Sequence, residues 1–208
     1  MSGHDAGLDA LLALAPVIPV LVVDDVADAR PIAEALVDGG LPLLEVTLRT
    51  PAALDVIRAM AGVPGAVVGA GTVLNAAQLE AARAAGSRFI VSPGLTAPLA
   101  EAAMATGLPF LPGVATAGDI MRGLDLGLSR FKFFPAMAAG GLPALRALAA
   151  PFGEVRFCPT GGITAATAPD WLAEPQVACV GGSWLVPRGA ADRAAITARA
   201  RQARALGG

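Results

Sequence analysis

The sequence lacks tyrosine and contains one histidine, two cysteines and a single lysine, Lys132, among its 15 basic residues. With no tyrosine, and with His4 near the N-terminus, proton transfer in a site must fall to a carboxylate, a lysine, a thiol or water. Two sulfurs and one histidine cannot supply a usual zinc site, so we expect no metal. Cys158 and Cys179 fall in expected strands, which favours two buried thiols over a disulfide or a catalytic pair.

Charged residues are also scarce, at 15% of the chain, and the net charge is only −2. No run of like charges is present, so we expect no nucleic-acid partner. The longest apolar run, residues 10–23, is too short to span a bilayer and contains Pro16 and Pro19, so we expect no membrane partner. The residues before this run lack the lysine or arginine of a signal peptide. These features predict a cytoplasmic protein.

Short runs of β-branched or aromatic residues alternate with Ala- and Leu-rich segments of helical length. This alternation predicts a parallel (β/α)8 TIM barrel, formed as a single domain by residues 1–208. An extra N-terminal helix, roughly 5–14, would close the bottom. An open doubly wound sheet is the rival, but no G-x-G-x-x-G opens a helix after the first strand. The expected strands are 17–23, 43–48, 66–71, 89–93, 109–113, 130–135, 155–160 and 177–182. Expected helix N-caps are Thr50, Asn75, Thr96, Thr116 and Thr164.

A barrel carries its catalytic groups at the carboxyl ends of its strands. The sixth expected strand contains Lys132. Because side chains alternate along a strand, Arg130, Lys132 and Phe134 share an inward face, and the intervening phenylalanines pack against the helices. The alternative is a structural lysine whose stem packs while its ammonium reaches water. Burial among aromatic residues instead favours a neutral amine, which can attack a ketone and form a Schiff base.

The second expected strand places Glu45, Thr47 and Arg49 on its inward face. One interpretation is a structural ion pair between Glu45 and Arg49. The other makes Glu45 a general acid and base, while the planar fork of Arg49 binds a substrate carboxylate. The sequence alone leaves both open.

Glycine pairs end the seventh and eighth expected strands, in "PTGGI" (159–163) and "GGSWL" (181–185). Loops at these two strands form the usual phosphate site of a barrel, so the pairs indicate a phosphate cradle rather than simple turns. Thr72 in "GAGTV" adds a hydroxyl at the end of the third strand. Pro93 stiffens the rim at the end of the fourth.

The segments "EVTLRTPAAL", "GAGTVLN", "SPGLT", "FKFFPA", "CPTGGI" and "GGSWLVP" together resemble the bacterial 2-keto-3-deoxy-6-phosphogluconate aldolase / 4-hydroxy-2-oxoglutarate aldolase family. The resemblance runs from about residue 16 to residue 187, in the same order. It implies a cofactor-free class I aldolase on a (β/α)8 barrel, usually a homotrimer. Such an enzyme splits 2-keto-3-deoxy-6-phosphogluconate, a phosphorylated keto acid, into pyruvate and glyceraldehyde 3-phosphate in the Entner–Doudoroff pathway. It also implies cleavage of 4-hydroxy-2-oxoglutarate to pyruvate and glyoxylate.

The resemblance also assigns roles to residues. Lys132 would form the Schiff base and Glu45 would shuttle protons. The remaining assignments are Arg49 and Thr72 for the substrate carboxylate, Gly161, Gly162, Gly182 and Ser183 for the phosphate, and Pro93, Phe134 and Thr160 for the rest of the pocket.

Alternatives remain at this stage. Thr160 and Ser183 resemble the gluconate-type enzyme rather than the related 6-phosphogalactonate aldolase. A phosphosugar isomerase or epimerase on the same barrel would use Glu45 as a base, and a non-catalytic binder would use only the phosphate cradle. Met137 and Ala139 stand where the family often has glutamate and serine, a departure that bears on specificity and rate.

Overall fold

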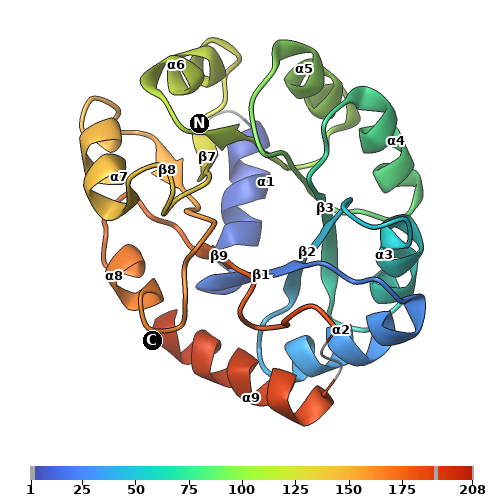
Figure 1. Ribbon diagram of the computed structural model, residues 1–208. Coiled ribbons are helices and arrows are strands. Elements are labelled where there is room, and N and C mark those ends of the chain that lie inside the picture. Colours follow the sequence, from blue (N-terminus) through green and yellow to red (C-terminus); the bar gives the residue numbers. More distant parts are fainter. Residues whose placement is uncertain (1–2, 190–191, 208) are drawn as a thin grey trace.

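Short parallel strands occupy the centre of the molecule, and helices surround them (Figure 1). The computed structural model describes residues 3–189 and 192–207, so the expected domain range of 1–208 extends slightly beyond the described residues. The strands are β1 (Val17–Leu21), β2 (Leu43–Thr47), β3 (Val67–Gly71), β4 (Ile90–Val91), β5 (Phe110–Leu111), β6 (Gly113–Val114), β7 (Arg130–Phe133), β8 (Arg156–Phe157) and β9 (Val180–Gly182). The helices are α1 (Gly3–Leu12), α2 (Ala29–Asp38), α3 (Ala53–Ala61), α4 (Ala76–Ala84), α5 (Ala97–Thr106), α6 (Ala117–Asp125), α7 (Gly141–Ala149), α8 (Ala168–Leu172) and α9 (Arg193–Arg204), with short 3-10 turns η1 (Val26–Asp28) and η2 (Ala205–Gly207).

The strands form a curled parallel arrangement in two sheets rather than one continuous ladder. The first has the order β5-β4-β3-β2-β1-β9 and the second β6-β7-β8. The strand expected over 109–113 is divided at Pro112, which has no N–H for a ladder. Beside this break, a side chain on Gly113 would overlap the carbonyl of Pro93, so the two backbones pass closely. The α/β class with parallel strands is confirmed; seven of the expected strands are present with shorter bounds, and the strand expected over 109–113 appears as β5 and β6, the second of which ends at Val114.

Buried apolar residues form two clusters on opposite faces of the strands. Leu44 and Val46 of β2, with Phe131 and Phe133 of β7, belong to the larger cluster, which includes residues of the surrounding helices. Leu43, one residue earlier on β2, belongs to a smaller cluster on the other face. The expected alternation along these strands is therefore confirmed. Lys132, between the two phenylalanines, and Glu45, between Leu44 and Val46, point inward.

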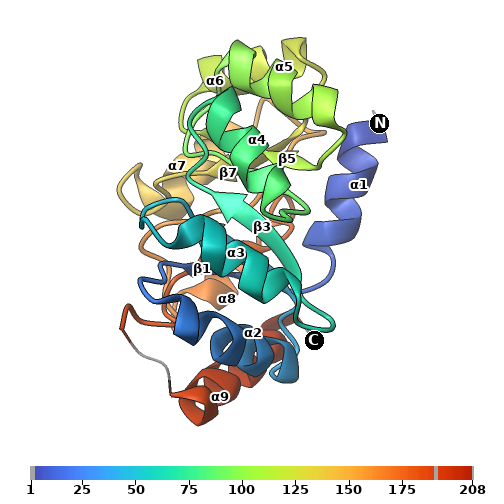
Figure 2. The same cartoon turned by 90° about the vertical axis from the view of Figure 1, so that its right-hand side faces the viewer.

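Helix α1 covers one end of the strands (Figure 2), opposite the end toward which β3 points. The expected extra N-terminal helix is confirmed, and it begins at Gly3, so His4 belongs to this helix rather than to a tail. Leu8 and Leu12 of α1 are 1% and 4% exposed. Burying each leucine stabilises the fold by about 1.5–3 kcal/mol, which fixes the helix against the strand ends.

Two of the expected helix starts are wrong. Thr50 donates its hydroxyl hydrogen bond to the carbonyl of Val23, and α3 begins three residues later. Thr164 lies in a turn with Thr167, before α8. Thr116, in contrast, forms a complete capping box with Asp119 at the start of α6. Within the described ranges no helix is both long and apolar enough to cross a membrane.

Candidate active site

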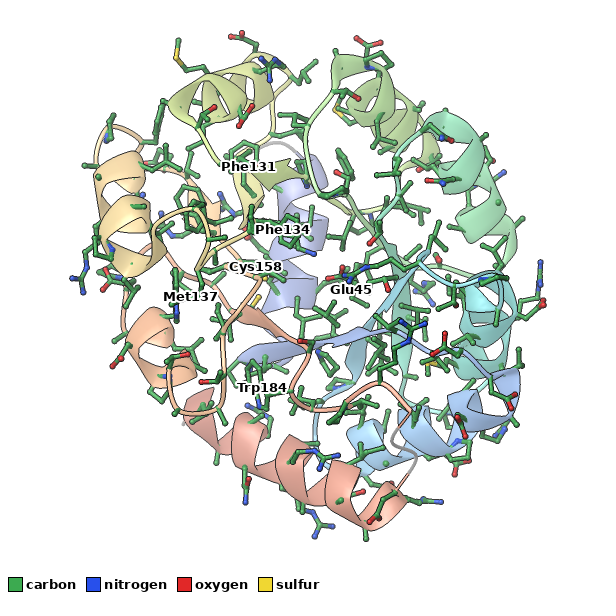
Figure 3. The ribbon with its side chains drawn as sticks, viewed as in Figure 1. Glu45, Phe131, Phe134, Met137, Cys158 and Trp184 are labelled. Atoms are coloured by element: carbon green, nitrogen blue, oxygen red, sulfur yellow. The ribbon has the colours of Figure 1, made fainter. Side chains whose placement is uncertain are left out.

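Lys132 and Glu45 face each other in the interior (Figure 3 labels Glu45). The Lys132 Nζ lies 3.0 Å and 3.3 Å from the two carboxylate oxygens of Glu45, and the side chains are 6% and 3% exposed. The sequence predicted a neutral amine from burial alone. The structure adds a carboxylate within hydrogen-bond distance of this nitrogen, so Lys132 Nζ has a proton acceptor in direct contact.

Gly71 of β3 explains how Glu45 fits in this position. Any Cβ on Gly71 would overlap the Oε1 atom of Glu45. The strands β2 and β3 pair in parallel with Glu45 opposite Gly69 and Thr47 opposite Gly71, so the Glu45 side chain reaches forward to the next inward position of β3, where Gly71 has no Cβ. Gly71 thus provides room for a side chain of the protein itself.

Arg49 pairs with Thr72 and not with Glu45. Its Nε donates to Thr72 Oγ1 at 3.3 Å. Thr72 has a φ of 59°, and among the described residues it is the only non-glycine with positive φ. A threonine in this left-handed region costs on the order of 1–3 kcal/mol, and such strain clusters at functional sites. The structural alternative of a Glu45–Arg49 ion pair is therefore not observed in the described part of the chain.

Arg49 lies in the wall of a cavity of about 160 Å³, and neither Lys132 nor Glu45 is among the residues that line it. The ring of Phe134, which lines the cavity, has its centre 5.3 Å from Lys132 Nζ. The lining includes the expected Arg49, Phe134, Thr160, Gly161, Gly162 and Ser183, together with Val20, Val22, Ile163 and Gly181, which had no assigned role in the predicted site. Val20 and Val22 lie at the carboxyl end of β1, so the rule that placed the other site residues at strand ends also applies to them.

Gly182, predicted for the phosphate, is not part of this wall. A side chain on Gly182 would overlap the Trp184 ring, whereas one on Gly181 would overlap Thr160. Because alternate residues of β9 point to opposite faces, Gly181 takes the inward position. Pro93 and Thr72 also lie outside the lining. Thr72 remains linked to the cavity through its contact with Arg49.

The turn of Gly161 and Gly162 has the features of an anion cradle. Their φ angles are 106° and 77°, which suit glycine, and successive N–H groups in such turns converge on anions. The neighbouring loop holds this turn, since Ala136 N donates to Thr160 O at 2.8 Å and Met137 N donates to Gly161 O at 3.0 Å. Within the described residues, no backbone acceptor engages the N–H groups of Gly161 and Gly162.

Cys158 and Cys179 are both buried and free, and both belong to the smaller apolar cluster (Figure 3 labels Cys158). A hydrogen bond with Cys158 raises the pKa of the Cys179 thiol well above its usual value, and burial and the charge of Glu45 act in the same direction. The thiol therefore stays protonated near neutral pH and is a poor nucleophile. Across residues 3–189 and 192–207, no three His, Cys, Asp or Glu side chains gather as a metal-binding group.

Comparison with known proteins identifies clear relatives. Residues 8–199 match the family model for KDPG and KHG aldolase. The chain is 63% identical to the 2-dehydro-3-deoxy-phosphogluconate aldolase of Zymomonas mobilis, over 96% of each sequence. A crystal structure of the Zymomonas mobilis 2-keto-3-deoxy-6-phosphogluconate aldolase with 3-phosphoglycerate superimposes with a TM-score of 0.94, at 62% identity over 96% of this chain and 95% of that one. The KDPG aldolase of Legionella pneumophila, with pyruvate captured as a covalent carbinolamine, gives 0.91 at 45% identity over 94% and 97%.

Proposed function

This chain belongs to the KDPG and KHG aldolase family, and we propose that it cleaves 2-keto-3-deoxy-6-phosphogluconate to pyruvate and glyceraldehyde 3-phosphate as a class I aldolase. The observation that carries the proposal is the buried contact between Lys132 Nζ and Glu45, 3.0 Å apart. This pair supplies a nucleophilic amine and a proton acceptor together. The carbinolamine captured in the Legionella pneumophila relative supports covalent capture of the keto acid.

Glu45 and Lys132 carry the proton transfers of the reaction. Glu45 accepts the ammonium proton, and the freed amine adds to the C2 carbonyl. Glu45 then returns the proton to the carbinolamine hydroxyl, which leaves as water and gives the iminium. Next, Glu45 takes the C4 hydroxyl proton, the C3–C4 bond breaks, and its electron pair moves into the iminium to form an enamine. Protonation at C3 and hydrolysis release pyruvate and restore Lys132.

Two anion sites would hold the substrate at either end. We assign the carboxylate to Arg49 and Thr72, since the guanidinium fork matches a carboxylate and Thr72 aligns it. The phosphate falls to the turn of Gly161 and Gly162, with Ser183 at the cavity wall. Thr160 and Phe134 line the space between the two sites. Binding at both ends would position C2 for attack by the amine.

A cleavage assay tests the proposal. Purified protein is given 2-keto-3-deoxy-6-phosphogluconate, its C4 epimer of the galactonate series, or 4-hydroxy-2-oxoglutarate, and released pyruvate is measured. We expect kcat/KM to be highest for the gluconate compound, and Glu45→Gln to lower its kcat by about 10²–10⁴-fold through loss of the acid and base. A phosphosugar isomerase, an epimerase or a simple binder would release no pyruvate. A preference for the epimer would instead identify a 6-phosphogalactonate aldolase.

Five further features belong to the same proposal. The two sheets would close as one (β/α)8 barrel, which the bridges from Phe157 to Val177 and from Thr160 to Gly181 support. The enzyme would need no metal, because the iminium withdraws electrons as a Lewis acid does. It would act in the cytoplasm as a single-domain homotrimer. Sedimentation of the purified protein tests the trimer. Turnover in the presence of a chelator tests the metal independence.

A further inference from the structure

Lys132 and Glu45 belong to different sheets, so their separation depends on how β7 is held against β2. Strand β7 lies in the three-stranded sheet and β2 lies in the six-stranded sheet. The isolated bridges between these sheets join residues near β8 and β9, and on the other side the backbone N–H of Lys132 donates to the carbonyl of Pro112, between β5 and β6. A further contact that joins both sheets close to the ion pair therefore affects the distance between Lys132 and Glu45.

The polar side of α1 holds β7 through Arg130, which is buried with a side-chain exposure of 10%. Its Nε and Nη2 donate to the two carboxylate oxygens of Asp9, at 2.6 Å and 2.8 Å. Its Nη1 donates to the carbonyl of Glu154 and to Ser129. Asp5, one turn before Asp9, accepts from the Ser129 hydroxyl at 2.8 Å. The beginning of β7 is thus fixed to α1 by a two-pronged ion pair.

The apolar side of α1 packs with the strands of the other sheet. Leu8 and Leu12 belong to the smaller apolar cluster, together with Leu43 of β2 and Ile18 of β1. Leu43 precedes Glu45 by two residues, and Arg130 precedes Lys132 by two residues. Because alternate residues share a face, Leu43 and Arg130 both belong to the layer beneath the ion pair; Arg130 contacts α1 directly, and Leu43 shares a buried cluster with Leu8 and Leu12 of α1.

We propose that Arg130 is a positioning residue for the aldolase reaction, and that its ion pair with Asp9 holds β7 on α1 and so sets the distance between Lys132 and Glu45. The inference rests on the function proposed above. A well-packed apolar pair could stabilise the same site equally well. A guanidinium–carboxylate fork adds a defined distance and direction, which proton transfer over hydrogen-bond distances requires.

The test compares variants of the full-length protein. Arg130→Met keeps most of the side-chain volume and removes the fork, and Asp9→Asn removes the partner charge. We expect kcat for cleavage to fall about 10- to 100-fold in Arg130→Met while KM changes less than about twofold, because a misplaced catalytic group slows chemistry more than binding. The rate at which pyruvate and borohydride trap Lys132 should fall in parallel. The double variant should lose no more than Arg130→Met alone, since Asp9 acts through Arg130.

Arg156→Gln is the matched control. Arg156 pairs in register with Arg130, but its side chain donates to the carbonyls of Gly153 and Val155. All variants are assayed well below their unfolding temperatures, so that lost stability does not lower the rate. If Arg130→Met does not fold, Asp9→Asn and Arg130→Lys decide. If the wild-type protein is trapped by pyruvate and borohydride, and the folded variants show the same kcat and the same trapping rate, the positioning role alone is overturned. A wild-type protein that traps no pyruvate would overturn the proposed function itself.

Discussion

Gly71 leaves the space that the carboxylate of Glu45 occupies. The two residues lie on neighbouring strands, and a Cβ on Gly71 would overlap Glu45 Oε1. The glycine therefore fixes the rotamer that points Glu45 at Lys132. An acid placed at a barrel strand does not by itself make a proton shuttle, because the neighbouring strand must also leave it room.

Gly71→Ala should remove activity while most of the fold remains. The added methyl forces Glu45 away from Lys132, so we expect kcat to fall about 10²-fold or more through loss of acid–base catalysis. Overpacking should lower the free energy of unfolding by about 1–3 kcal/mol. Urea unfolding and pyruvate release measure the two effects. Gly153→Ala, where no heavy atom lies within 4 Å of the new Cβ, should keep wild-type activity. A fully active Gly71→Ala would show that the Glu45 rotamer does not matter.

Thr72→Gly should weaken binding without loss of stability. Glycine relieves the strain of the positive φ at residue 72, and this offsets its larger conformational entropy in the unfolded chain. The lost hydroxyl no longer aligns Arg49, so we expect KM for the keto acid to rise about 5- to 10-fold, as for loss of one hydrogen bond. Thr72→Ser keeps the hydroxyl and should retain the wild-type KM. Equal KM values in the two variants would contradict the role of the hydroxyl.

The Cys179 thiol should make the free energy of unfolding decrease as the pH rises in the alkaline range. Its pKa is raised in the folded protein by the hydrogen bond with Cys158 and by burial, so the unfolded chain loses this proton first. The thiol's contribution to stability is present below the unfolded pKa of about 8.5 and is lost as the pH rises above it. Urea unfolding at pH 7 and pH 9.5 should show this loss. Cys179→Ala should show a smaller decrease between these pH values, and an identical decrease would count against the assignment.

Period-two alternation predicted which residues of β2 and β7 point inward, because the pattern is local to each strand. The partner of Glu45 could not be predicted in the same way. Lys132 lies 87 residues further along the chain, and its approach depends on the curvature of the sheets. Arg49, four residues from Glu45, therefore looked like the nearer candidate.

Other differences have similarly non-local causes. Thr50 fails as a cap because the carbonyl of Val23, from another strand end, takes its hydroxyl. Gly181 lines the cavity and Gly182 does not, because a shift of one residue along β9 reverses the face. The ion pair between Asp9 of α1 and Arg130 was not predicted, since it joins residues 121 positions apart.

The mass of the protein after treatment with pyruvate and borohydride tests the central claim most directly. Because Lys132 is the single lysine, its adduct can be assigned by comparison with Lys132→Arg, which controls for reaction at the N-terminal amine. We predict one reduced pyruvyl adduct on the wild-type protein, and neither this adduct nor turnover in Lys132→Arg. An unmodified wild-type protein, or a Lys132→Arg variant that still cleaves the substrate, would contradict the account.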